Sequence, residues 1–84
     1  MDNVKEKKWK VMIADDNRDI NEVVKDTLIE NGYGVIQAFD GKETLAVFEE
    51  HEPDLIFLDY LMPEINGLDV LKKIKKKDPD ALVV

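Results

Sequence analysis

Three aspartates stand where two apolar runs of the sequence end. Asp15 and Asp16 follow the run at residues 9–14, and Asp59 follows the run at residues 55–58. If these runs are neighbouring parallel strands, their carboxyl ends meet at one edge of the sheet and the three carboxylates converge in one crevice. Like charges this close repel, so at least one carboxyl would take up a proton unless a counter-charge is present.

A hard divalent cation would remove this repulsion. Mg²⁺ (or Mn²⁺ in its place) prefers oxygen ligands, keeps several waters, and is commonly held by one or two carboxylates together with phosphate oxygens. A carboxylate beside such an ion can attack phosphorus and form an aspartyl phosphate. Of the three aspartates, Asp59 is the one we expect to act as this phosphoacceptor.

The residues after Asp59 are suited to shape a loop at such a site. Pro63 fixes its own φ and holds Met62 in an extended conformation, while Gly67 lets the chain turn tightly into the next helix. We therefore expect Met62, Pro63 and Gly67 to set the backbone geometry next to the metal.

Strand-like and helix-like segments alternate along the chain. Strands are expected at residues 9–14, 33–38 and 54–58, with a fourth just starting at 81–84. Helices are expected from an N-cap at Asp16 or Asn17 to a stop at Gly32, then at residues 42–51, closed by Pro53 and preceded by an Asp40-Gly41 turn, and at 66–77. The residues expected to face inward on these helices are Ile20, Val23, Val24, Thr27 and Leu28; Leu45 and Phe48; and Val70, Leu71 and Ile74.

This alternation predicts right-handed βαβ crossovers and an α/β fold with a parallel sheet. The apolar run at 55–58 has no polar interruption, so the third strand should be buried on both faces and lie centrally. In the flavodoxin-like strand order 2-1-3-4-5, the first and third strands are neighbours, and the switch point falls between them.

Composition limits the classes of protein to which the chain can belong. With 84 residues, 44% hydrophobic and 37% charged, it should form at most one small globular domain. The absence of cysteine excludes disulfides and thiolate metal sites, and the net charge of −7 disfavours nonspecific binding to nucleic acid or to an anionic membrane. Without a signal peptide or an apolar run of roughly 18 residues, the expected location is the cytoplasm.

Taken together, these residues resemble the receiver domains of two-component response regulators. The resemblance extends over essentially the whole chain. It rests on the paired aspartates after the first strand and on the spacing D-x-x-M-P-x-x-x-G, which runs from Asp59 through Met62 and Pro63 to Gly67.

The resemblance implies a flavodoxin-like receiver fold and a role in signalling rather than enzymatic turnover. It implies that Asp59 accepts a phosphoryl group from a histidine kinase or a phosphotransfer protein. It also implies that Asp16 ligates Mg²⁺ directly, that Asp15 helps to hold the ion partly through water, and that the backbone carbonyl of Leu61 is a further ligand.

The sequence also departs from the family pattern, because family members continue through a fourth strand ending in Ser or Thr and a fifth ending in Lys. Neither group is present in a chain that ends at Val84. We therefore expect residues 1–84 to be a C-terminally truncated, partial receiver without its output domain. Such a piece could self-associate through an exposed sheet edge, and it could be folded yet lack phosphotransfer activity.

Other interpretations of these residues stay open. A phosphohydrolase with an Asp nucleophile would usually carry a second Asp two residues later, where this chain has Leu61. The same apolar side chain predicts slow hydrolysis of an acyl phosphate, since it cannot orient water. His51 is expected to be a solvent-facing helix end and the lysine-rich run at 72–77 a solvated face, and a purely structural fragment is a third possibility.

Overall fold

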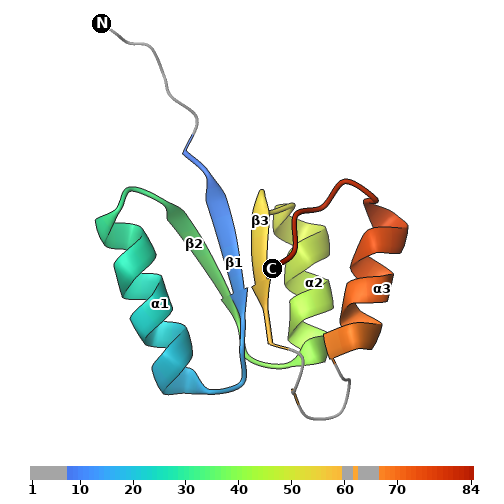
Figure 1. The fold of residues 1–84 in the computed structure, drawn as a ribbon, viewed down its shortest axis with the longest axis horizontal. Coiled ribbons are helices and arrows are strands. Elements are labelled where there is room, and N and C mark those ends of the chain that lie inside the picture. Colours follow the sequence, from blue (N-terminus) through green and yellow to red (C-terminus); the bar gives the residue numbers. More distant parts are fainter. Residues whose placement is uncertain (1–7, 60–61, 63–66) are drawn as a thin grey trace, which may run out of the picture.

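The centre of the structure is a parallel three-stranded sheet (Figure 1). The computed structural model describes residues 8–59, 62 and 67–84. Strand β1 (Lys10–Ala14) lies between β2 (Gly34–Ala38) and β3 (Leu55–Leu58), giving the order β2-β1-β3. Met12 of β1 pairs with Ile36 on one side and with Ile56 on the other. The predicted α/β architecture, with its parallel sheet and the first and third strands as neighbours, is confirmed.

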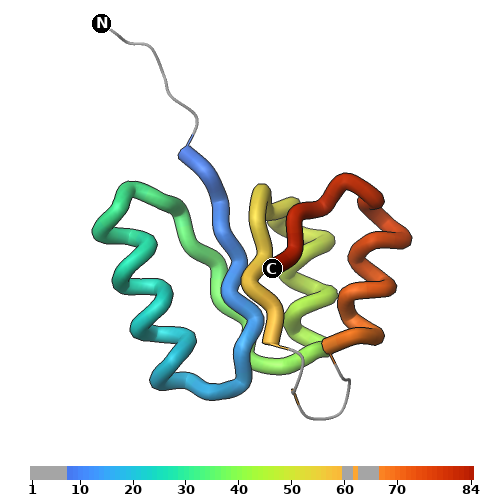
Figure 2. Tube along the Cα trace, viewed as in Figure 1, coloured from blue at the N-terminus to red at the C-terminus, as the bar shows by residue number. Residues whose placement is uncertain are grey.

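Three helices cover the two faces of this sheet unequally. Helix α1 (Arg18–Glu30) packs on β1 and β2, whereas α2 (Gly41–His51) and α3 (Gly67–Lys77) pack together on the opposite face (Figure 2). Because successive side chains of a strand point to opposite faces, each strand serves both layers. The main core joins alternate residues of β1 and β3 to α2 and α3, and its buried members are Met12, Ala14, Ala38, Phe48, Ile56, Leu58, Met62, Val70, Ile74 and Ala81.

Side-chain caps fix where the first two helices begin. The side chain of Asn17 accepts a hydrogen bond from the N–H of Ile20 (3.1 Å). Asp40 accepts one from the N–H of Glu43 (2.7 Å), and the Glu43 carboxylate in turn accepts one from the N–H of Phe39 (2.7 Å). Asp40 is thus the N-cap of a helix that begins at Gly41, so the predicted start at residue 42 was one residue late.

The end of α2 follows from backbone geometry. Glu52 adopts a left-handed conformation (φ 48°), and its N–H donates to the carbonyl of Phe48, immediately before Pro53. His51, the last residue of α2, is exposed as predicted, and its carbonyl accepts a hydrogen bond from Lys10 Nζ (2.7 Å). None of the helices in the described part of the chain is both long and apolar enough to cross a membrane.

Helix α3 matches its predicted pattern. Val70 and Ile74 are buried, Leu71 is half-buried, and every lysine of the run at 72–77 is exposed. Lys75 Nζ donates to the carbonyl of Ala81 (2.6 Å), and Lys77 forms an ion pair with Glu49 of α2. The exposed lysines thus form the solvent-facing side of α3. Lys75 and Lys77 in addition connect α3 to Ala81 and to α2.

Helix α1 departs from its predicted pattern. Ile20 and Val23 are 50% and 63% exposed, and Thr27 is exposed as well. The buried position is instead Asn21, followed on the same face by the half-buried Val24 and Leu28. The predicted inward face was wrong for Ile20, Val23 and Thr27, because among the described residues no element packs against that side of the helix.

The segment at residues 81–84 lies along the outer side of β3. Val83 forms a parallel bridge with Ile56, and the carbonyl of Val84 accepts a hydrogen bond from the N–H of Leu58 (3.0 Å). β3 therefore lies between β1 and this short segment, and β1 is the central strand of the described sheet. Leu55 and Phe57 are only half-buried, so the prediction that β3 is buried on both faces was wrong for the face that α1 covers incompletely.

Candidate metal centre

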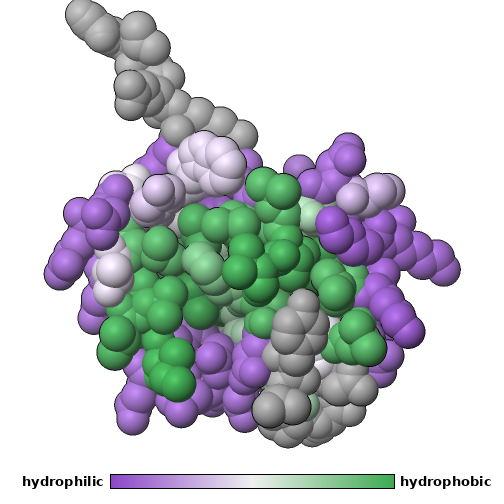
Figure 3. Space-filling view, viewed as in Figure 1, coloured by the Kyte–Doolittle hydropathy of each residue, from purple (hydrophilic) through white to green (hydrophobic). Residues whose placement is uncertain are grey.

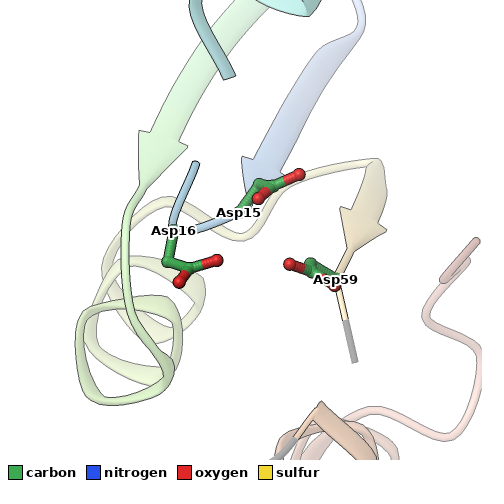
Figure 4. A group of neighbouring side chains, drawn as sticks. All are labelled: Asp15, Asp16 and Asp59. Carbon is green, nitrogen blue, oxygen red and sulfur yellow. The ribbon is translucent and has the colours of Figure 1, made fainter. Parts of the chain in front are cut away.

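The structure brings Asp15, Asp16 and Asp59 together at the carboxyl ends of β1 and β3 (Figure 4). One oxygen from each carboxylate lies within 4.8 Å of the other two. The backbone sets this arrangement, because the N–H of Asp59 donates to the carbonyl of Ala14 (2.9 Å) and that of Asp15 to the carbonyl of Ala38 (3.1 Å). The strand ladder thus continues one residue past β1 and β3 and carries the carboxylates to a common edge.

The electrostatics of the cluster act most clearly on Asp15, which is half-buried. Burial raises the pKa of its carboxyl, and so do the neighbouring charge of Asp59, a hydrogen bond to the Asp59 side chain and the charge of Asp16. The N–H of Asn17, which donates to Asp15 Oδ1 (2.9 Å), lowers the pKa and offsets part of this rise. A cation in the cluster would favour the charged form of Asp15.

The donor set and its spacing fit a hard cation. The three groups offer only carboxylate oxygens, which are the ligands that Mg²⁺ prefers. The three oxygens lie within 4.8 Å of one another, so side chains from two strand ends can converge on one ion.

The acidic cluster forms one end of a cavity of about 550 Å³. The rest of the wall is mostly apolar and comes from α1, from β1 and β3, and from the last residue of the chain. The lining residues are Ile13, Ala14, Asp15, Asp16, Asn17, Ile20, Val24, Phe57, Leu58, Asp59 and Val84. The carboxylates therefore line a space that is large enough for a phosphoryl group.

The structure describes only some of the remaining predicted site residues. Met62 is buried in the main core, and Gly67 is the buried first residue of α3. Leu61 and Pro63 lie outside the described residues, as does residue 66, the predicted start of α3. The metal-ligand role of the Leu61 carbonyl and the loop-shaping role of Pro63 stay predictions.

Two residues next to the site were missed by the sequence analysis. Asn21 is fully buried, and its Nδ2 donates to the carbonyl of Asp15 (3.0 Å). Gln37 of β2 donates through Nε2 to Asn21 Oδ1 (2.8 Å). A signal for Asn21 was present, since it lies three residues before Val24 and seven before Leu28, on the face that packs against the sheet. A polar residue at such a position has to find hydrogen-bond partners in the interior.

Comparison with known proteins identifies the family. A family model described as the response regulator receiver domain matches residues 11–84. The chain belongs to the response regulator receiver family. Chemotaxis protein CheY of Bacillus subtilis is 36% identical over 76 residues, which cover 89% of this chain and 63% of that protein.

Solved receiver structures have the same fold. The response regulator TrrA from Thermotoga maritima, solved in complex with Mg²⁺-BeF, is 39% identical, with a TM-score of 0.85 over 89% of this chain and 65% of that one. A CheY-like receiver domain protein from Methanospirillum hungatei is 28% identical, with a TM-score of 0.89 over 92% of this chain and 62% of that one. The chain thus spans less than two thirds of the length of these relatives.

The family membership decides between two of the interpretations drawn from the sequence. The chain is a response regulator receiver with a CheY-like fold and an acidic cluster, and not a turnover enzyme. The phosphohydrolase interpretation is therefore excluded.

Proposed function

We propose that residues 1–84 form part of a receiver domain in which Asp59 accepts a phosphoryl group from a histidine kinase or a phosphotransfer protein. Mg²⁺, or Mn²⁺ in its place, would be held by Asp15, Asp16 and Asp59 together with the backbone carbonyl of Leu61. The observation that carries this proposal is the convergence of three carboxylates from two strand ends within 4.8 Å. That the related TrrA was solved with Mg²⁺-BeF supports the choice of ion and of ligand class.

The chemistry proposed for Asp59 is a single transfer. A carboxylate oxygen of Asp59 attacks the phosphorus of a phosphohistidine, the P–N bond breaks, and its electron pair returns to the imidazole nitrogen. A cation held by the three carboxylates would supply positive charge to neutralise the phosphoryl oxygens. Ala14 contributes by fixing the backbone from which Asp59 reaches into the cavity, because the N–H of Asp59 donates a hydrogen bond to the Ala14 carbonyl.

The loop after Asp59 is assigned a supporting role. We propose that Met62 anchors it, since its side chain is buried in the core. Pro63 and Gly67 would limit the conformations of the chain between Met62 and α3. A cytoplasmic location, and an output domain outside this chain, stay expectations from the sequence.

The first test is phosphorylation in the presence of MgCl₂. The chain is incubated with beryllofluoride or with acetyl phosphate, and adducts are followed by fluorine NMR and intact-mass spectrometry. We expect one phosphoryl group or one beryllofluoride per chain, and we expect chelation of the metal to abolish both.

Two substitutions make this test specific. Asp59→Ala should remove the adduct completely. Asp19→Ala is the matched control, because Asp19 is an exposed carboxylate in the first turn of α1, three residues after Asp16 in the sequence but outside the cluster. An adduct that persists in Asp59→Ala would falsify the assignment of the phosphoacceptor.

A second candidate function is a folded receiver piece that lacks phosphotransfer activity and associates with itself. The observation that favours it is the open apolar side of α1 and β3, where Ile20, Val23 and Val84 are each at least half exposed. The same incubation distinguishes the two candidate functions. A receiver piece without phosphotransfer activity forms no adduct with either reagent, although circular dichroism shows that it is folded.

A further inference from the structure

Asn21 is a fully buried polar residue on the face of α1 that packs on the sheet. Its Nδ2 lies 3.0 Å from the carbonyl of Asp15, 3.1 Å from that of Ala38 and 3.5 Å from that of Ile13. One amide group thus joins α1 to the carboxyl ends of both β1 and β2. This is the edge of the sheet at which the acidic cluster is built.

A chain of hydrogen bonds fixes which way the Asn21 amide points. Lys25 pairs with Glu22 (2.7 Å), and the Glu22 carboxylate, which can only accept, receives a hydrogen bond from Gln37 Nε2 (3.1 Å). The same nitrogen donates to Asn21 Oδ1 (2.8 Å). The oxygen of Asn21 is therefore turned toward Gln37, and its nitrogen is turned toward the backbone carbonyls.

The bonds made by Asn21 complete the anchoring of Asp15. The N–H of Asp15 donates to the carbonyl of Ala38, and Asp15 Oδ1 accepts from the N–H of Asn17. With Asn21 donating to its carbonyl, Asp15 is held at its N–H, at its C=O and at its carboxylate. Ala38 accepts from both Asp15 and Asn21, so it links the two anchors.

We infer that Asn21 is a positioning residue that holds Asp15 in place for metal binding, with Gln37 orienting it. This inference rests on the proposed function of the cluster as a metal site. Repulsion among the three carboxylates pushes Asp15 away from Asp16 and Asp59, and a backbone fixed by Asn21 opposes that displacement. Removing partners that orient metal ligands typically lowers metal affinity about 10- to 100-fold.

The test compares Mg²⁺ affinity with stability in matched variants. Asn21→Leu removes the amide and keeps the branched shape of the side chain, and Gln37→Met removes the group that orients Asn21, at a half-buried position. Thr44→Val is the control, since Thr44 is also fully buried and its hydroxyl donates to the carbonyl of Asp40 (2.7 Å), away from the carboxylates. Calorimetric titration with MgCl₂ alone gives the Kd, and urea denaturation gives the free energy of unfolding.

We expect Asn21→Leu to raise the Kd for Mg²⁺ about tenfold or more, and Gln37→Met to raise it by less. Thr44→Val should lower stability and leave the Kd unchanged. A Kd equal to that of the unmodified chain in both Asn21→Leu and Gln37→Met overturns the inference. If Asn21→Leu does not fold, the Kd of Gln37→Met for Mg²⁺ alone tests the inference.

The same titration keeps this inference separate from the proposed function. Absence of Mg²⁺ binding in the unmodified chain overturns both. Normal binding in the unmodified chain that the two variants retain overturns only the role of Asn21. Weaker binding in Thr44→Val as well would show that any lost buried hydrogen bond has this effect, which also contradicts a specific role for Asn21.

Discussion

At the scale of single residues, the ionisation of Asp15 links the acidic cluster to the stability of the chain. Its pKa is raised above the ordinary value of 3.8, first by burial and then by Asp59. Between the ordinary and the raised pKa, the folded chain binds more protons than the unfolded chain. The contribution of Asp15 to stability is therefore fully present below pH 3.8 and is lost as the pH rises through the raised pKa.

Asp15→Asn should consequently stabilise the metal-free chain at neutral pH. The amide keeps the shape of the side chain but removes one of three like charges. Urea denaturation should show a higher free energy of unfolding at pH 7 for Asp15→Asn than for the unmodified chain, and a smaller difference near pH 3.

Addition of MgCl₂ at pH 7 should reverse this ranking, because a ligand that binds only the folded state stabilises it and the variant has lost one carboxylate. Asp19→Asn, outside the cluster, should show neither effect. Equal stability of Asp15→Asn and the unmodified chain at pH 7 without metal would contradict the repulsion argument.

What could be predicted from sequence at this scale depended on the kind of residue. The aspartates were identified because each ends an apolar run, and the topology then brings strand ends together. Asn21 could have been noticed as a polar residue on the face of α1 that packs on the sheet, but its pairing with Gln37 could not, since that hydrogen bond joins residues 16 apart in the sequence. Such a pairing requires the register of β2 beside α1, which no local pattern contains.

At the scale of elements, α1 and α3 show the limit of helical periodicity. Both sequences have apolar residues at helical spacing, yet α3 buries its predicted residues Val70 and Ile74 whereas α1 exposes Ile20 and Val23. The spacing defines an apolar stripe but does not say how much of it a neighbouring element covers. The width of the buried face is decided by tertiary packing.

This difference predicts unequal costs for shortening side chains on the two helices. Ile74 of α3 is fully buried in the main core. Ile74→Ala should therefore lower the free energy of unfolding by about 2–5 kcal/mol. Val23 is 63% exposed, and Val23→Ala should change it by less than about 0.5 kcal/mol.

Both values come from urea denaturation at pH 7 with the m-value compared between variants. A large cost for Val23→Ala would mean that α1 is covered in solution by something outside the described residues, such as a second copy of the chain.

At the scale of the whole molecule, the two faces of the sheet differ in how they are covered. Two helices close one face, and α1 covers only the β1 and β2 side of the other. The view in Figure 3 shows a broad apolar area across one side of the molecule. A second cavity of about 320 Å³ on the α1 face is lined by Trp9, Val11, Leu28, Tyr33, Leu55 and Phe57.

We expect this surface to drive self-association, because exposed apolar patches of this kind favour contact between molecules. Size-exclusion chromatography with light scattering should give a mass above that of the monomer, increasing with concentration. Ile20→Lys, in the wall of the larger cavity, should shift the chain toward the monomer.

Leu68→Lys provides the matched control. Leu68 is 52% exposed, close to the 50% of Ile20, but it lies on α3 and lines neither cavity. It should leave the mass unchanged. A concentration-independent monomer of the unmodified chain would remove self-association as a property of this molecule.

The global fold was the part that sequence predicted best. Alternating segments led to the parallel sheet and to β1 beside β3, and the start of a fourth strand was confirmed by the bridge between Val83 and Ile56. The predicted burial of Leu55 and Phe57 was too high. An uninterrupted apolar run shows that a strand can be buried on both faces, but it does not show that other elements cover both faces.

The position of β1 has a consequence for how quickly backbone amides exchange with deuterium. Within the described sheet it has a full strand partner on each side, whereas β3 has only a short segment on its outer side. The backbone amides of β1 from Val11 to Ala14 should therefore exchange only when the whole chain unfolds. Those of residues 82–84 should exchange through local fraying, long before the strand that carries Asp15 and Asp16 opens.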